Sequence, residues 1–323
     1  MDNPAINIIS VCSGAGGLDL GVGNAIRLLG FEPRTVAYVE REAFACAVLA
    51  ERMEAGDLDV APIWTDLASF SGRWFSGYCG MVIAGLPCQP YSVAGKKLGA
   101  DDERYLWPAF FDLLQTVRPA VVFLENVTGL LRFFEPIGQR LCAMGYEIEA
   151  GIFSAAEVGA PHRRERLFVL AHSDGFRRDS RWQRQQGIPA SADAGKPMAD
   201  ACGKRWGGRD HGYDAQDEGE IQAPGSRCAM GDTAGEIPVW PPAPGDRDGW
   251  GRVVAMRPDL APAVDGKLNP RFVEWLMGLP VGWTEIPGAS RIDRLRALGN
   301  AVIPATAELA FRALWEQASW ENG

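Results

Sequence analysis

The feature that most constrains the fold is an alternation of short apolar runs with helical segments in the first part of the chain. The expected strands are Asn7 to Cys12, Arg34 to Val39, Ile63 to Trp64, Met81 to Ala84 and Ala120 to Leu124. The expected helices between them are Leu18 to Leu29, Glu42 to Ala55 and Tyr105 to Val117. This alternation predicts a fold of the α/β class, with a doubly wound, mostly parallel sheet.

Polar side chains follow several of these strands. Glu40, Asp66, Cys88 and Glu125 each come at or just after a strand end. In open parallel sheets, ligands bind beyond the carboxyl ends of the strands. These four residues therefore predict a functional site at one edge of the sheet.

Composition narrows the class of protein. Of 323 residues, 47% are hydrophobic and 23% charged, which is typical of a folded globular protein. There is no apolar run of about 18 residues for a membrane span and no pattern of a secretory signal. The net charge of −9 excludes a uniformly basic nucleic-acid coat but leaves room for a local basic patch.

Cysteine usage indicates free thiols in a reducing compartment. The seven cysteines are an odd number and form no C-x-x-C pair, which argues against a disulfide framework or a zinc site. We predict no metal. Apart from Cys88, most cysteines are expected to be buried and structural, namely Cys12, Cys46, Cys79, Cys142, Cys202 and Cys228.

The chain changes character after about Ser173. Residues 174–250 are rich in Gly, Pro, Arg, Trp and Gln and show little periodicity. They have a basic first part and an acidic second part. This predicts a loop-rich second region, with a solvated linker as the alternative. Regular patterns return near Leu268 to Leu279 and continue through Ile292 to Asn300 into a last helix, about Ala305 to Ala318.

A glycine cluster lies between the first strand and helix. Its residues, Ser13 to Gly17, allow positive φ and a close approach of the backbone to a ligand. Glu40, at the end of the next strand, is placed to bind a ribose. The glycine spacing is not G-x-G-x-x-G, which disfavours a nicotinamide enzyme and leaves an adenosine-bearing cofactor. A purely structural glycine turn is the alternative.

Two prolines flank Cys88 in the segment GLPCQPYS. Proline fixes φ and stiffens the loop, which would aim the thiol at one point. A thiolate is a strong nucleophile. A buried structural cysteine is the alternative, and a Cys/His pair of the protease type is weakly supported because no His is close in sequence.

Glu125 and a group of arginines complete the candidate chemistry. A carboxyl in a cleft can have a raised pKa and donate a proton, although Glu125 could equally cap the next helix. Arg164 and Arg166 open the predicted strand from Leu167 to Leu170 and are expected to share a face. Arginines in that arrangement suit phosphate or a planar acceptor, with ordinary surface charge as the alternative.

Taken together, these motifs resemble the DNA cytosine-5 methyltransferases that use S-adenosylmethionine, of the bacterial or phage type. The resemblance rests on Ser10 to Gly17, Gly85 to Ser92, Glu125 to Val127, Pro161 to Phe168 and Gly299 to Val302, in the family's order. The Pro-Cys-Gln core followed by Glu-Asn-Val is the most specific part.

The resemblance implies a mechanism. The Cys88 thiolate adds to carbon 6 of a cytosine flipped out of the duplex, and Glu125 protonates ring nitrogen 3. Carbon 5 then takes the methyl group, a base removes the carbon-5 proton, and Cys88 is eliminated. Arg166 would bond the carbonyl oxygen of the base, and Arg164 would contact the DNA backbone near the flipped nucleotide.

The resemblance also implies the cofactor contacts and the product, S-adenosylhomocysteine. Ser13 to Gly17 (with Gly14, Ala15 and Gly16) would approach the methionine moiety, Glu40 the ribose and Asp66 the adenine amine. The remaining matched contacts are Leu86, Pro87, Asn300 and Val302. Three residues differ from those that the family usually has at the same positions. Cys12 occupies a position that is usually Phe, His162 one that is usually Gln, and Tyr91 one that is usually Phe or Trp.

We expect residues 1–172 and 268–323 to form the catalytic domain and residues 173–267 the target-recognition domain, with double-stranded DNA between them. The nucleic-acid contacts would come from Gln89, Ser92, His162, Arg163, Arg177, Arg178, Arg181, Arg184, Lys204, Arg205 and Arg209. Trp182, Trp206 and Trp250 are expected to pack in a small core.

The predicted enzyme is a sequence-specific DNA methyltransferase. A tRNA cytosine-5 methyltransferase and a non-catalytic DNA-binding homologue are the alternatives. We further expect a monomer in the bacterial or phage-infected cytoplasm, associated with the nucleoid, without membrane contact. A cognate restriction endonuclease, if one is present, would form no stable complex with it.

Overall fold

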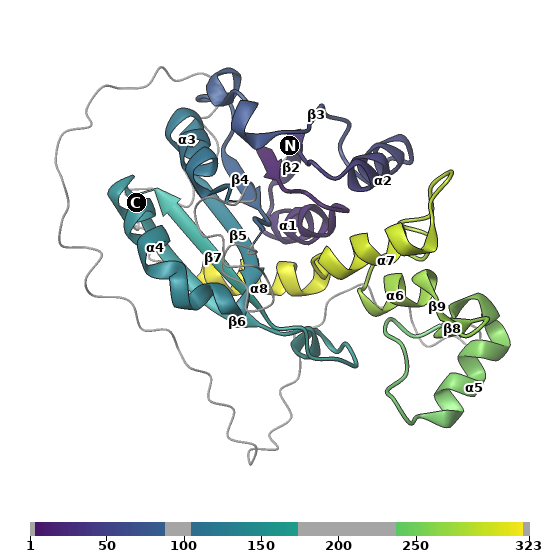
Figure 1. Ribbon diagram of the computed structural model, residues 1–323. Coiled ribbons are helices and arrows are strands. Elements are labelled where there is room, and N and C mark those ends of the chain that lie inside the picture. Colours follow the sequence, from purple (N-terminus) through teal and green to yellow (C-terminus); the bar gives the residue numbers. More distant parts are fainter. Residues whose placement is uncertain (1–3, 88–104, 174–236, 319–323) are drawn as a thin grey trace, which may run out of the picture.

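The structure is a computed structural model that describes residues 4–87, 105–173 and 237–318. One seven-stranded sheet forms its centre (Figure 1). Its strands are β1 (Ala5–Val11), β2 (Glu32–Val39), β3 (Ile63–Trp64), β4 (Met81–Ala84), β5 (Val121–Val127), β6 (Tyr146–Phe153) and β7 (Arg166–Ser173). The helices are α1 (Gly17–Leu28), α2 (Ala43–Glu54), α3 (Trp107–Val117), α4 (Phe134–Ala143), α5 (Arg247–Met256), α6 (Pro270–Leu276), α7 (Arg291–Asn300) and α8 (Pro304–Gln317).

The strand order is β3-β2-β1-β4-β5-β7-β6. Neighbouring strands from β3 to β5 are parallel, while β7 is antiparallel to both β5 and β6. The predicted doubly wound, mostly parallel sheet is confirmed. Because β7 runs the other way, its first residues lie at the edge where the parallel strands end.

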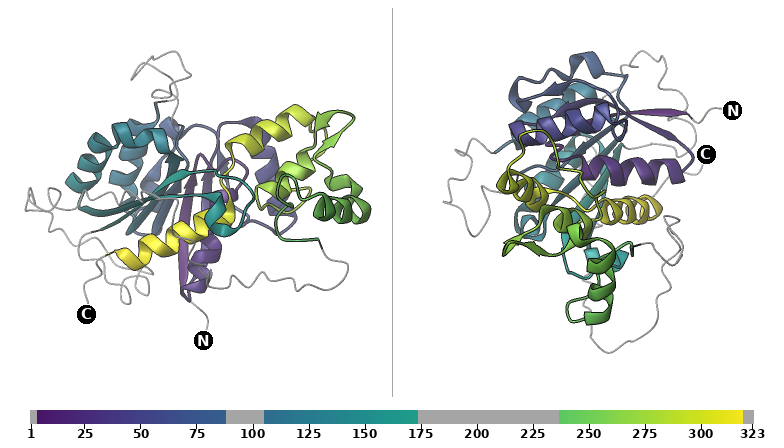
Figure 2. Two further views of the ribbon diagram at one scale, coloured as in Figure 1. Left: turned by 90° about the horizontal axis from the view of Figure 1, so that it is seen from below. Right: turned by 90° about the vertical axis from the view of Figure 1, so that its right-hand side faces the viewer.

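Helices cover both faces of the sheet, as Figure 2 shows. On one face α3 and α4 pack on alternate residues of the central strands, such as Ile9, Val82 and Val122. On the other face α1 and α8 pack on residues such as Ile8, Ile83 and Phe123. The period-2 alternation of strand side chains thus fills two separate cores.

A third cluster joins the two ends of the chain. It combines Ala15 in the glycine loop and Leu49 on α2 with Trp283, Leu298 and Ile303 from the C-terminal part. This cluster packs the C-terminal part of the chain against the glycine loop.

The described part of the second region is more regular than expected. It contains α5 and a hairpin of β8 (Ala263–Val264) and β9 (Lys267–Leu268). A small core of Val253, Leu260 and Trp275 unites it with α6. In Figure 1 these elements lie beside the sheet, and α7 leads from them back to α8.

Two sequence-based expectations at the sheet edge are wrong. β5 continues to Val127, so Glu125 lies inside the strand rather than after it, because the strand keeps pairing with β7 through Val127 and Arg166. β7 begins only at Arg166, so Arg164 precedes the strand, and strand alternation does not place the two arginines on one face.

Candidate active site

The predicted site residues that the structure describes gather at one edge of the sheet. The ends of β1, β2, β3, β4 and β5 meet there, together with the beginning of β7. The glycine loop follows β1, Glu40 follows β2, and Asp66 lies just after β3. Leu86 and Pro87 follow β4, and Glu125 lies near the C-terminal end of the strand β5. The geometry therefore divides into a side near β1 to β3 and a side near β5 and β7.

The glycine loop bends sharply between β1 and α1. Gly14 and Gly16 have φ values of 55° and 81°, in the left-handed region that favours glycine. At Gly17, an added Cβ would lie 2.3 Å from the carbonyl oxygen of Val302. Only glycine permits that approach, so the glycine loop and the C-terminal segment pack closely against one another.

Glu40 fastens the same loop. Its side chain is buried and accepts hydrogen bonds from the backbone N–H of Gly14 (2.7 Å) and of Glu42 (2.8 Å). Asp66 is exposed and caps the short helix Leu67–Ser69 by accepting from the Ala68 N–H at 3.0 Å. Both carboxylates are thus fixed by backbone donors at the edge where a cofactor is expected.

These residues fit an adenosine-bearing cofactor. Among the described residues, no heavy atom lies within 4 Å of the position that a Cβ on Gly14 would take. Each carboxylate oxygen has further acceptor capacity beyond the bonds described. Carboxylates suit the hydroxyl donors of a ribose and the amine donor of an adenine.

Glu125 and Arg166 form the centre of the other side. Arg166 Nε lies 3.0 Å from Glu125 Oε1, and the two side chains are 20% and 11% exposed. Burial raises the pKa of the Glu125 carboxyl above its ordinary value, although the neighbouring Arg166 and Arg164 cations oppose that rise. A carboxyl with a raised pKa beside a fixed guanidinium is better suited to donate a proton than an ordinary surface carboxylate.

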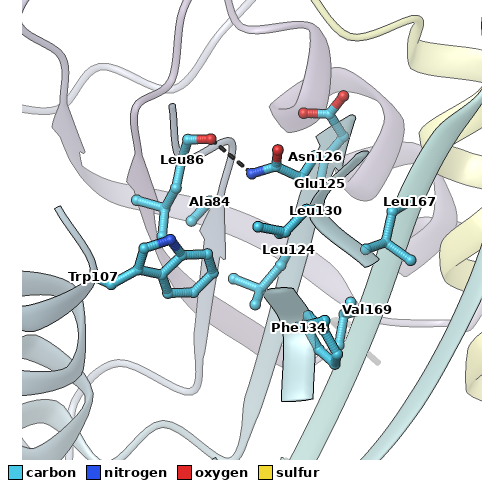
Figure 3. A pocket seen from close by; sticks show the side chains of 10 residues that line it. All are labelled: Ala84, Leu86, Trp107, Leu124, Glu125, Asn126, Leu130, Phe134, Leu167 and Val169. Atoms are coloured by element: carbon cyan, nitrogen blue, oxygen red, sulfur yellow. Dashed lines mark hydrogen bonds between the residues drawn. The ribbon is translucent and has the colours of Figure 1, made fainter. Parts of the chain in front are cut away.

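Asn126 is a residue that the sequence reasoning passed over. Its Nδ2 donates to the carbonyl oxygen of Leu86 at 2.8 Å, and its Oδ1 accepts from the Val127 N–H at 2.9 Å. Figure 3 shows this amide pointing to Leu86 while the Glu125 carboxylate turns away from the apolar side chains. Asn126 thereby ties β5 to the chain that leads to Cys88. Its place between Glu125 and Val127 in the matched motif was the available signal.

A small apolar pocket lies beneath these two residues (Figure 3). It is lined by Ala84, Leu86, Trp107, Leu124, Glu125, Asn126, Leu130, Phe134, Leu167 and Val169. Glu125 and Asn126 are the residues of this lining that carry a carboxylate or an amide side chain.

The segment before β7 holds the remaining charged candidates. Arg164 Nη2 donates to the carbonyl oxygens of Gly299 at 2.7 Å and Ala301 at 2.8 Å. His162 Nε2 lies 3.0 Å from the Leu276 carbonyl oxygen, and Arg163 is exposed. Arg164 and His162 thus contact the C-terminal segment, whereas Arg163 faces solvent.

The remaining cofactor candidates lie near the glycine loop. Ser13 donates to the Ser10 carbonyl oxygen at 3.1 Å, Asn300 is exposed, and Val302 is buried. Trp283 was not predicted as a site residue. Its Nε1 donates to the Ala15 carbonyl oxygen at 2.7 Å, so a distant indole holds the loop.

Several predicted residues lie outside the described residues. They are Cys88, Gln89, Tyr91, Ser92, Arg177, Arg178, Arg181, Trp182, Arg184, Cys202, Lys204, Arg205, Trp206, Arg209 and Cys228. Of the predicted core tryptophans, Trp250 packs against Phe272 and Trp275.

The described cysteines are free thiols, with Cys79 buried and Cys12, Cys46 and Cys142 partly buried. Burial and the neighbouring Glu40 carboxylate raise the pKa of the Cys12 thiol to about 12. Burial likewise raises the pKa of the Cys79 thiol to about 12. Both thiols are therefore protonated at neutral pH and are poor nucleophiles.

Comparison with known proteins identifies the family. The model of the C-5 cytosine-specific DNA methylases matches residues 6–203, which is more than half of the chain. The chain belongs to this family. The resemblance recognised in the sequence is confirmed, and the chain is a sequence-specific DNA cytosine-5 methyltransferase.

Relatives agree with this assignment. The type II methyltransferase M.NaeI of Lentzea aerocolonigenes is 27% identical over 94% of this chain and 73% of its own length. M.NgoMIV of Neisseria gonorrhoeae is 34% identical over 54% of each. The chain thus spans about half the length of the second relative.

Solved structures share the fold. A DNMT2 variant of Spodoptera frugiperda superposes with a TM-score of 0.58 at 15% identity, covering 96% of this chain and 99% of that one. The methyltransferase EhMeth of Entamoeba histolytica gives 0.57 at 15% identity, covering 98% and 99%. In the described part of the chain, no helix is long and apolar enough to cross a membrane.

Proposed function

We propose that this DNA cytosine-5 methyltransferase works through a covalent adduct between Cys88 and carbon 6 of a flipped-out cytosine. The observation that carries the proposal is the buried Glu125 carboxyl beside Arg166, one strand away from the segment that leads to Cys88. Asn126 donates a hydrogen bond to the Leu86 carbonyl oxygen in that segment. One side chain therefore joins the strand that carries the proposed acid to the segment that leads to the proposed nucleophile.

Glu125 is the proton donor in this scheme. Protonation of ring nitrogen 3 draws electrons out of the ring, which helps the thiolate to form its bond at carbon 6. The resulting enamine makes carbon 5 nucleophilic. A carboxyl whose pKa is raised by burial keeps its proton nearer to neutral pH, which is what a general acid needs.

Arg166 has two roles in this proposal. Its Nε holds the Glu125 carboxyl at 3.0 Å and its Nη1 donates to the Glu165 carbonyl oxygen at 2.8 Å, so Nη2 is the donor that suits the carbonyl oxygen of the base. Removal of the carbon-5 proton by a base then lets Cys88 leave, and ring nitrogen 3 returns its proton to Glu125, which restores the free thiolate, the carboxylic acid and the aromatic ring.

S-adenosylmethionine is the proposed cofactor, and it supplies the methyl group when bound. Glu40 and Asp66 would hold its ribose and adenine, and the loop Ser13 to Gly17 its methionine part. Leu86, Pro87, Asn300 and Val302 complete the proposed set. The buried Glu40 carboxylate and the open space at Gly14 support this assignment.

The division into a catalytic domain (1–172 and 268–323) and a target-recognition domain (173–267) is also proposed. The small core around Val253 and Leu260 supports a separate unit, although it includes Trp275 from beyond residue 267. DNA would lie between the two, with the exposed Arg163 among its contacts. A monomeric state, the relation to a restriction endonuclease and nucleoid association stay predictions.

The test replaces the proposed nucleophile. Cys88→Ala should abolish methyl transfer to duplex DNA while cofactor affinity stays within about twofold, because only the bond to carbon 6 is lost. Bisulfite sequencing of the treated DNA reads the methylation, and titration with S-adenosylhomocysteine reads the affinity. Cys142→Ala, on α4, is the matched control and should methylate normally.

A trapping experiment sharpens the test. Duplex DNA that carries fluorine at carbon 5 offers no proton to remove, so the adduct should persist as a band shift on a denaturing gel. Wild-type protein should form this band and Cys88→Ala should not. Turnover by Cys88→Ala equal to wild type would overturn the covalent mechanism, and methylation of tRNA in preference to duplex DNA would support the alternative substrate.

A further inference from the structure

Arg164 occupies an unusual place for a residue expected to bind DNA. Its Nη2 is already shared between the carbonyl oxygens of Gly299 and Ala301. Its Nε is buried and, within the described residues, has no hydrogen-bond partner. A phosphate prefers an open fork of two guanidinium nitrogens, and here the edge formed by Nε and Nη2 is used or covered, which leaves Nη1 alone.

The acceptors of Arg164 lie at the end of a helix. Gly299 belongs to the last turn of α7, and Ala301 is the residue that follows the helix. Carbonyl oxygens at a helix C-terminus lack partners within the helix and carry partial negative charge. A cation is therefore favoured at this end. Burial lowers the pKa of Arg164 only to about 10, so the side chain is charged at neutral pH.

The turn held by Arg164 touches the cofactor side. Ala301 and Val302 are buried, and the Val302 carbonyl is so near Gly17 that any Cβ there would collide with it. A shift of this turn would therefore move the first residue of α1 and the loop before it. On the other side, the Arg164 cation lowers the pKa of Glu125, which burial raises.

We propose that Arg164 is a positioning residue that fastens the turn from Gly299 to Val302, and through it the glycine loop, to the edge of the sheet that carries Glu125. This inference rests on the proposed cofactor site, and it differs from the role in DNA-backbone contact that the family resemblance implies. Arg164 touches neither reactant; it holds the cofactor-binding side and the base-binding side in one geometry.

The test compares Arg164→Met with Arg164→Lys. Met keeps most of the side-chain length without the donors or the charge, whereas Lys keeps the charge and can donate to one carbonyl. S-adenosylhomocysteine affinity, measured by calorimetry without DNA, should fall roughly 10- to 100-fold in Arg164→Met and partly recover in Arg164→Lys. Arg312→Met, on α8, where the partly exposed guanidinium pairs with Glu308 at 3.8 Å, is the control and should bind as wild type.

The same variants are measured on duplex DNA at several salt concentrations. A positioning role predicts a raised KM for the cofactor with an unchanged salt dependence of DNA affinity. A phosphate ligand predicts normal cofactor affinity, weaker DNA binding and a salt slope reduced by about one. The second pattern would overturn the proposal.

A readout without any ligand separates this inference from the proposed function. Hydrogen exchange of the backbone amides at 13–17 and 299–303 should rise together in Arg164→Met, because both segments lose one support. Unchanged exchange in both segments would refute the inference even if the covalent mechanism stands. If Arg164→Met does not fold, Arg164→Lys carries the same exchange comparison, and protection equal to wild type at 13–17 and 299–303 would again refute it. Methyl transfer by Cys88→Ala would refute the covalent mechanism, but it would not change the hydrogen-exchange result for Arg164.

Discussion

The two sides of the active-site edge hold their carboxylates in different ways. On the side of β1 to β3, Glu40 accepts from backbone amides of the glycine loop and of Glu42. On the side of β5 and β7, Glu125 faces the Arg166 guanidinium and lies over apolar walls. A carboxylate tied to amides serves to shape a loop, whereas a desolvated carboxyl beside cations is prepared to exchange a proton. One edge of the sheet thus holds one carboxylate that shapes a loop and another carboxyl that is suited to proton transfer.

The largest expected effect breaks the chemical side. Glu125→Gln should lower the rate of methyl transfer by about 10²–10⁴-fold, because the amide cannot donate the proton, while cofactor affinity is preserved. Single-turnover kinetics on duplex DNA measure the rate. In the wild type, the rate should also decline as the pH rises through the raised pKa of Glu125. This decline should be absent in Glu125→Gln.

The control for that change is Glu135→Gln, an exposed side chain on α4. It should leave both the rate and its pH dependence as in the wild type. A normal rate in Glu125→Gln would remove this carboxyl from the mechanism.

A smaller effect is expected on the structural side. Glu40→Gln keeps one acceptor oxygen and loses one of two backbone bonds, so S-adenosylhomocysteine affinity should fall about tenfold. The rate at saturating cofactor should change little, in contrast to Glu125→Gln. Glu42→Gln serves as the control, because that side chain is exposed and only its backbone N–H is used. Equal losses in the two variants would contradict the assigned difference between the sides.

Much of this edge could be predicted from the sequence, but not all of it. The strands could be predicted because apolar runs such as Met81 to Ala84 are visible directly, and the glycine loop because Gly14, Gly16 and Gly17 lie together between a strand and a helix. β6 and α4 were not predicted, although Tyr146, Ile148 and Ala150 alternate with Glu147 and Glu149 in β6. The contact from Arg164 to the Gly299 carbonyl joins residues 135 positions apart, and backbone acceptors leave no signature in side-chain identity.

Glu125 shows a more subtle limit. The sequence predicted a carboxylate beyond the strand, whereas the strand continues past it because β7 pairs with Glu125, Asn126 and Val127. A strand end depends on the length of its partner, and that partner lies farther along the chain. Local patterns place the residue at the correct edge but cannot fix its backbone conformation.

The smallest expected effect concerns stability and the helix behind the glycine loop. Asp19 on α1 is buried, accepts from Ser10 Oγ at 3.0 Å, and has its pKa raised to about 7, mainly by burial. The folded state therefore keeps a proton that the unfolded chain, with the ordinary value of 3.8, has lost. Stability should fall as the pH rises from about 4 to about 7 and remain low above that.

Asp19→Asn removes this titration while it keeps an acceptor for Ser10. Its Tm should exceed that of the wild type at pH 8 by on the order of 5 °C, and the two should converge near pH 4. Thermal unfolding across this pH range gives the measurement. Parallel curves of Tm against pH for the two proteins would show that Asp19 does not control the pH dependence of folding stability.

The indole of Trp283 bonds to the Ala15 carbonyl across 268 positions of sequence. Contacts of such separation form late, because the intervening chain must first be ordered. During synthesis the strands β1 to β5 leave the ribosome well before Trp283 and Val302 exist. The growing polypeptide can therefore assemble most of its sheet while the proposed cradle for the methyl donor is still incomplete. On this proposal, the ability to bind that donor arises only when the last helices have been made.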